Sequence, residues 1–248
     1  MIANKQLILL DNLSTLEKQK SILNSLKEME KLIQQKEQVA IITNEEYIYA
    51  LMFTMQENAF IREKQEKYDS ATLLLYRLLE MIEQRRLSKY NINVAHANFL
   101  NIQFDSKKTP EYKKLSAEDR LTKYKQEMYD IKLKVFGKCS SSYLSEQISL
   151  LEGFLHLTAL KDELMTFNKI DPIAKCKKLR SVVYLRNNSI FAHGYSPVSY
   201  TDFLKFKNYV IELFGQMCEL EHVDYEKYTD AMQFLNPVDS KYCSLGVK

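Results

Sequence analysis

The chain has 248 residues and a formal net charge of +3, and 46% of its residues are hydrophobic. This length supports one or two domains with a substantial core, and the hydrophobic content excludes a disordered chain. The five glycines and four prolines are few for a sheet protein with tight turns, so the composition favours long helices. The mild charge neither requires nor excludes nucleic acid.

The chain carries no pattern typical of export or of a membrane span. Its four cysteines are widely spaced without a CxxC pair, which predicts reduced thiols in an intracellular protein: Cys139, Cys176, Cys218 and Cys243. The apolar runs are too short to cross a bilayer, and the N-terminus lacks the regions of a signal peptide. We therefore expect a cytoplasmic protein without a membrane partner.

Three helices are predicted in the first third of the chain. Residues 13–38 have an apolar face and form either a packed helix or a coiled-coil connector: Ile22, Leu26, Met29 and Ile33. Asn44 is expected to cap a second helix that runs to about residue 65. The third helix, capped by Asp69 or Ser70, contains "ATLLLYRLLEMIEQRRL".

A polar strip runs along the third predicted helix. Arg77, Glu80 and Gln84 are spaced to share one face of it. Two interpretations remain open, an exposed Arg–Glu pair of small energetic value or a polar strip that lines a cleft.

The middle of the chain is less regular and more basic. Residues 89–110 predict a loop or insertion with short pieces of structure, and residues 115–136 predict a helix. Lysine and arginine number ten against five acidic residues from Lys107 to Lys138, which indicates a solvated helix surface or a nucleic-acid contact. A further helix is expected to begin at Ser142 or Ser145.

The most informative stretch is "YLRNNSIFAHGYSP", residues 184–197. Asp171 and Pro172 form a typical helix start, and the apolar stripe of that helix leads to Arg186, which needs a partner there. His193 follows two turns later on the same predicted face, directly before Gly194. A last helix should run from residue 200 or 201 to about 220.

These elements predict an all-α protein of six to eight helices. We expect an N-terminal helical extension over residues 1–44 and one compact domain over residues 45–248.

The Arg and His suggest phosphodiester chemistry. Arginine offers a fixed charge and a rigid fork of donors for a phosphate, and histidine exchanges protons near neutral pH. Two such helices crossing in a dimer would pool two Arg and two His, which suits RNA cleavage by the ribose 2′-OH without a metal. The structural alternative is that His193 caps the helix and Arg186 pairs with Glu80.

The same stretch resembles a known family signature. "LRNNSIFAHGY" is similar to the RxxxxxxH motif of HEPN-domain ribonucleases. "YDSATLLLYRLLEMIEQRRL", residues 68–87, resembles the early helix of the HEPN part in CARF–HEPN proteins of type III CRISPR systems. The resemblance covers roughly residues 45–220, and the order of the segments also agrees.

The resemblance implies an HEPN-like helical domain that dimerises through its motif helices and cleaves single-stranded RNA in antiviral defence. It makes Arg186 and His193 the catalytic pair and Asn187 an accessory polar residue. The other positions suggested for accessory or RNA-binding roles are Asn188, Ser189, Tyr195, Lys178, Arg77, Glu80 and Gln84.

The sequence leaves two alternative functions open and predicts neither a sensor domain nor a cofactor. The chain shows no N-terminal sensor domain for cyclic oligoadenylate, so it is expected to be a stand-alone protein, a truncated relative or a fragment. The alternatives are an HEPN toxin held by an antitoxin, and a helical interaction module without catalysis. His156 is expected to pack in the core, and neither a metal nor another cofactor is predicted.

Overall fold

The computed structural model describes residues 2–35, 38–138, 143–187 and 197–232, and these residues form helices and loops without a strand. The predicted all-α class is confirmed. The α-helices are α1 (Ile2–Gln34), α2 (Gln38–Thr43), α3 (Glu45–Lys64), α4 (Tyr68–Ser88), α5 (Ala117–Phe136), α6 (Leu150–Ala159), α7 (Glu163–Thr166), α8 (Pro172–Asn187), α9 (Tyr200–Leu220) and α10 (Tyr225–Met232). Among the residues that the structure describes, short 3-10 helices lie at Phe99–Asn101, Pro110–Tyr112 and Phe167–Lys169.

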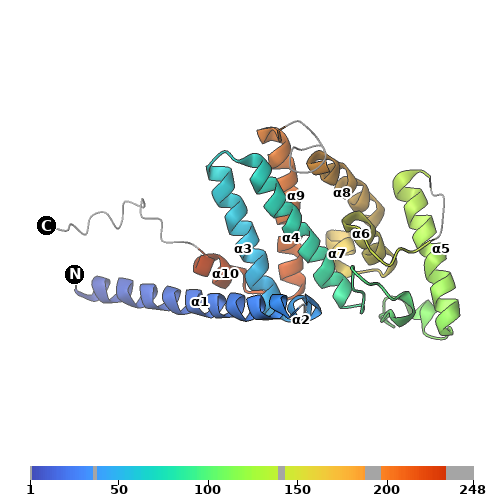
Figure 1. Cartoon of the computed structure of the whole chain (residues 1–248), viewed down its shortest axis with the longest axis horizontal. Coiled ribbons are helices and arrows are strands. Elements are labelled where there is room, and N and C mark those ends of the chain that lie inside the picture. The colour runs from blue at the N-terminus through green and yellow to red at the C-terminus, as the bar shows by residue number, and fades with distance from the viewer. Residues whose placement is uncertain (1, 36–37, 139–142, 188–196, 233–248) are drawn as a thin grey trace.

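Helix α4 lies at the centre of the bundle, in contact with α3, α6, α8 and α9 (Figure 1). Its predicted apolar stripe is completely buried and includes Leu75, Leu78 and Leu79. The sequence periodicity therefore identified the core face of this helix correctly. The contact of α4 with both α8 and α9 positions the two helices that flank the predicted motif.

Helix α1 projects from the bundle and contacts α2, α3 and α10 (Figure 1). Ile22 and Met29 on its predicted apolar face are buried, but Ile33 at the end of that face is 54% exposed. The packed-helix interpretation thus holds for the described central turns of α1. The proposed boundary between an extension and a domain at residues 44 and 45 stays a prediction.

Helix caps account for most of the correctly predicted starts. The Asn44 side chain accepts a hydrogen bond from Tyr47 N at 3.1 Å, and Ser199 accepts one from Asp202 N at 3.1 Å at the start of α9. Each cap satisfies a backbone donor that the first helical turn leaves free. The sequence-based start of α3 and the bounds of α9 are confirmed.

Two predicted starts are wrong, each for a local reason. Helix α6 begins at Leu150 because the preceding segment bonds to another loop, with Ile148 N donating to Val94 O and Ala97 N to Glu146 O, both at 2.8 Å. Backbone groups used in this way cannot start a helix at Ser142 or Ser145. Helix α4 begins at Tyr68, ahead of the predicted Asp69 or Ser70 cap.

His156 packs in the core, as predicted. It is fully buried, its ring stacks on Phe99 with centroids 5.2 Å apart, and its Nδ1 lies 2.7 Å from the Tyr124 hydroxyl. Burial, with a smaller contribution from the charge on Lys132, lowers the pKa of His156 to about 3. The imidazole is therefore neutral at ordinary pH, which fits an apolar environment.

This burial predicts sensitivity to acid. An unfolded histidine has a pKa of about 6.5, so the unfolded state binds the extra proton as the pH falls from there towards the folded value of about 3. In that window, His156 should lower the unfolding free energy by about 1.4 kcal/mol for each unit that the pH falls. Urea titrations of wild type and His156→Gln between pH 7 and pH 5 measure the difference in slope. An equal slope in His156→Gln would contradict the assignment.

Candidate functional site

Helix α8 carries the first half of the predicted motif. Asp171 starts it by accepting hydrogen bonds from Ile173 N at 3.1 Å and Ala174 N at 3.2 Å, and Cys176 is completely buried on its apolar side. Arg186 lies in the last turn of this helix, so the sequence-based start of α8 is confirmed and Arg186 is placed at its C-terminal end.

The rest of the motif lies outside the described residues. This applies to Asn188, Ser189, His193 and Tyr195, and also to the side chains of Arg186 and Asn187. The predicted continuation of the helix to Gly194 is likewise outside them. The roles assigned to these residues therefore stay predictions.

The chain that follows the motif is held against α4. Val198 N donates a hydrogen bond to Asp69 Oδ1 at 3.1 Å. The Tyr68 ring lies 5.2 Å from the ring of Tyr200 and 5.4 Å from that of Phe203. The carboxylate that was expected to cap α4 thus fixes the entry to α9 instead, only five positions after His193.

The polar strip on α4 contains a surface ion pair. Arg77 Nη1 lies 2.9 Å from Glu80 Oε2, with side-chain exposures of 50% and 30%, and Gln84 is half-buried one turn later. An exposed pair of this kind contributes about 0–1 kcal/mol. Glu80 is therefore already paired within its own helix.

Lys178, another predicted RNA contact, faces α9. Its Nζ lies 3.8 Å from Glu212 Oε2 and 5.2 Å from the centre of the Tyr209 ring. The side chain is 60% exposed, so it remains accessible. Arg180 on the same helix is also exposed and lies against Phe136 of α5. Helix α8 therefore carries exposed cationic groups on the side of α9 and on the side of α5.

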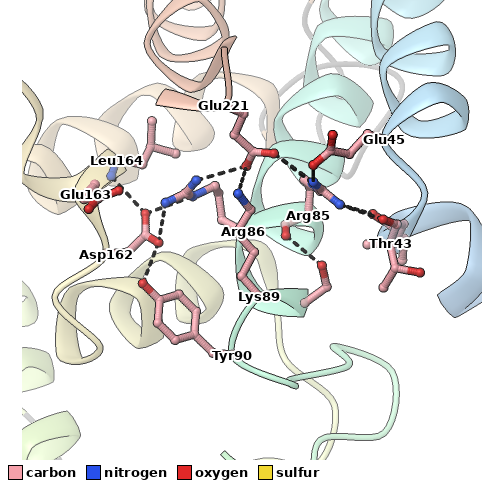
Figure 2. A network of polar contacts seen from close by, with 12 residues as sticks. Thr43, Glu45, Arg85, Arg86, Lys89, Tyr90, Asp162, Glu163, Leu164 and Glu221 are labelled. Atoms are coloured by element: carbon pink, nitrogen blue, oxygen red, sulfur yellow. Dashed lines mark hydrogen bonds and ion pairs between the residues drawn. The ribbon is translucent and has the colours of Figure 1, made fainter. Parts of the chain in front are cut away.

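A buried ionic network at the C-terminal end of α4 was not predicted (Figure 2). Arg86 forms a two-pronged contact with Asp162, from Nε at 3.1 Å and from Nη2 at 2.7 Å, and its Nη1 donates to Glu221 Oε1 at 2.9 Å. Tyr90 also donates its hydroxyl to Asp162, at 2.8 Å. Burial alone would lower the pKa of Arg86, but the two carboxylates outweigh it and raise the pKa above its usual value.

Arg85 extends this network to residues near the start of the domain in sequence. It donates to Glu221 Oε2 at 3.0 and 2.9 Å, to the Thr43 carbonyl at 2.9 Å and to Glu45 Oε1 at 2.7 Å. Burial would raise the pKa of Glu221, but Arg85 and Lys89 outweigh it and hold the pKa below its usual range. The pairing satisfies the buried charges and joins α4 to the α2–α3 junction and to the end of α9.

A buried carboxylate outside this network, Glu83, lies where α4 meets α6. Glu83 is 2% exposed, and its Oε1 has no hydrogen-bond partner among the described residues. Burial, reinforced by the charge on Glu80, raises its pKa well above the usual range. A Cβ atom added at Gly153 would meet Glu83 Oε1 at 1.6 Å and its Cδ at 2.3 Å, so this glycine makes room for the carboxyl group.

The close approach predicts the effect of one added methyl group. Gly153→Ala should lower the unfolding free energy by about 1–3 kcal/mol, because the buried Glu83 side chain must move. Gly215→Ala in α9 is the matched control, since its Cβ would meet nothing within 4 Å and alanine favours the helix by about 1 kcal/mol. Urea unfolding checks both, and equal effects at the two positions would refute the packing argument.

Within the described ranges, no three His, Cys, Asp or Glu side chains are grouped so that they could hold a metal ion. None of the helices, over the residues that the structure describes, is long and apolar enough to span a membrane.

The fold defines a helical domain in which the chain that follows the Arg-bearing helix α8 is held at the start of α4 by the contact between Val198 and Asp69. The family model of the Csm6 HEPN domain matches residues 39–216. The chain therefore belongs to this family and contains an HEPN domain of the CRISPR-associated type. The match covers α3 to α8 and most of α9 and leaves α1 outside. No curated protein matches the chain.

Proposed function

We propose that the chain is a metal-independent endoribonuclease that cleaves single-stranded RNA in CRISPR-linked antiviral defence. The observation that supports the proposal most directly is that the Arg-x₆-His motif begins in the last turn of α8, inside the residues matched by the HEPN family. The motif supplies the two side-chain types that transfer a proton and stabilise a phosphorane.

The proposed reaction is an internal transfer at phosphorus. The ribose 2′-oxygen attacks the adjacent phosphorus while a base takes the 2′-OH proton. The bond from phosphorus to the 5′-oxygen breaks, and an acid protonates that oxygen. The products are a 2′,3′-cyclic phosphate and a 5′-OH end. His193 serves as the acid or the base, and Arg186 stabilises the negative charge that develops on the phosphoryl oxygens.

The proposed active form is a homodimer. One histidine cannot give and take a proton in the same step, whereas two copies of α8 that cross at their C-terminal ends would supply a pair. Asn187, Asn188, Ser189 and Tyr195 are proposed to orient the reacting groups or hold RNA.

Exposed cations on α8 support an RNA path along this helix. Lys178 and Arg180 are accessible, and Lys177, directly before Lys178 in the sequence, is exposed as well. Positive side chains near the reacting phosphate would attract the RNA backbone without reading its sequence. Arg77, Glu80 and Gln84 of α4 are proposed to line the approach from the other side.

The test is cleavage of an end-labelled, unstructured RNA in the presence of EDTA. A matched substrate carries a single 2′-deoxy linkage at the main cleavage position. We expect cleavage to continue in EDTA, to stop at the deoxy linkage and to leave a cyclic phosphate. Cleavage of the deoxy linkage, or a strict requirement for a divalent ion, would contradict the mechanism. A complete absence of cleavage would favour the helical interaction module.

A further inference from the structure

A cavity between α8 and α9 contains a buried lysine that is not part of the proposed nuclease chemistry. Its volume is about 220 Å³, and it is lined by Ile170, Ala174, Lys175, Lys178, Tyr209, Glu212, Leu213 and Gln216. Lys175 lies eleven residues before Arg186, which is roughly 16 Å along the helix. The cavity is thus separate from the end of α8 that carries the motif.

The Lys175 ammonium group has neutral acceptors only. Its Nζ donates to the Leu164 carbonyl at 2.5 Å and to Gln216 Oε1 at 2.7 Å, and the residue is 6% exposed. An ammonium group has three donors, so these two bonds leave one for the cavity. Among the described residues, no carboxylate forms an ion pair with it. Buried lysines are rare unless they are paired with an opposite charge.

The acidic side chain in the cavity lining, Glu212, is linked to Lys175 through Gln216. Gln216 accepts from Lys175 and donates through Nε2 to Glu212 Oε1 at 3.2 Å. The other Glu212 oxygen lies 3.8 Å from Lys178 at the surface. The two lysines and the one glutamate leave the cavity with a formal charge of one positive unit.

The remaining walls are apolar. Leu213 is 1% exposed and Tyr209 5% exposed, while Ile170 is 39% exposed and Ala174 is exposed. A ligand that entered would cover apolar surface and meet the Lys175 ammonium. These walls favour a ligand with an apolar body and a single negative charge at one end.

We propose that this cavity binds a small organic monoanion whose acidic head pairs with Lys175 and whose apolar body lies against Leu213 and Tyr209. The head is a carboxylate or a phosphate, since both accept charge-assisted hydrogen bonds from an ammonium group. The ligand supplies the counter-charge that none of the described residues places beside Lys175.

The environment of Lys175 gives the site a pH signature. Burial lowers the pKa of Lys175 to about 8, while the charges on Glu212 and Asp162 raise it and that on Lys178 lowers it. The lysine loses its charge as the pH rises through this value. An anionic ligand should therefore bind more weakly at pH 9 than at pH 7.

The experiment compares benzoate with benzamide, which has the same shape without the charge, on the full chain at constant ionic strength. We expect benzoate, at about ten times its dissociation constant, to raise the Tm by about 4 °C. Benzamide should have little effect, and the benzoate shift should shrink at pH 9. Inorganic phosphate tests whether a head group without an apolar body is enough.

Variants locate the response. Lys175→Met should abolish the difference between benzoate and benzamide. Ala174→Phe should abolish it by filling the entrance while Lys175 stays in place, and this covers the case in which the first variant fails to fold. Lys177→Met should retain it, because Lys177 is exposed and does not line the cavity. The proposal is overturned if benzoate gives no shift at millimolar concentrations, if benzamide matches it, if phosphate alone equals it, or if Ala174→Phe leaves it unchanged.

Discussion

Replacing His193 by alanine is expected to lower the rate of RNA cleavage by about 10²- to 10⁴-fold, because the proposed reaction loses its proton-transfer group. Arg186→Ala should lower it by about 10²- to 10³-fold through lost stabilisation of the phosphorane. The readout is the single-turnover rate on a labelled RNA in EDTA, with thermal unfolding recorded for each variant.

Matched controls separate this effect from damage to the fold. His96 and Arg62 are exposed residues outside α8 and outside the motif, so His96→Ala and Arg62→Ala should cleave RNA at the wild-type rate. Equal cleavage by wild type and His193→Ala would remove the motif from the reaction. A fall in rate that follows a fall in Tm would assign His193 a structural role.

Replacing Arg86 by methionine is expected to lower the unfolding free energy by about 3–5 kcal/mol. The guanidinium satisfies Asp162 and Glu221 together, and both carboxylates are at most 1% exposed. Methionine has a similar length but no donor, so Asp162 would keep its bonds to Tyr90 and Leu164 N and lose its counter-charge. Urea unfolding followed by circular dichroism measures the change.

The same helix offers a control for this prediction. Arg77 forms an exposed pair with Glu80, so Arg77→Met should change the unfolding free energy by less than about 1 kcal/mol. A small loss for Arg86→Met, similar to that for Arg77→Met, would show that the buried network contributes little beyond the apolar core around it.

Local signals predicted the helices well because each depends on neighbours in sequence. Asn44 and the Asp171–Pro172 pair identified helix starts through their own side chains and backbone, and the leucine spacing identified the buried face of α4. The predicted start of α6 was wrong because Ile148 N donates a hydrogen bond to Val94 O, more than fifty positions earlier. The sequence around Ile148 does not indicate that its backbone bonds to a segment so far away along the chain.

The candidate site was predictable only where a motif exists. Arg186 and His193 are marked by spacing, by a polar neighbour and by the following glycine. The Arg85–Arg86 pair, by contrast, looks like the basic last turn of an ordinary surface helix, and its partner Glu221 lies 136 and 135 positions away. Lys175 likewise lies close in sequence to Lys177 and Lys178, and both of these lysines are exposed. Burial, which decides their roles, comes from tertiary packing.

Glu221 also determines how the domain can be shortened. The family match ends at residue 216, yet the carboxylate that neutralises two buried guanidinium groups comes five residues later. The Thr43 carbonyl and Glu45 complete the Arg85 contacts at the other end. A polypeptide cut at residue 216 would lose the carboxylate that the two guanidinium groups share, and would leave Arg86 with Asp162 and Arg85 with the more exposed Glu45. The carboxylate that completes the buried network therefore lies outside the segment that the family model matches.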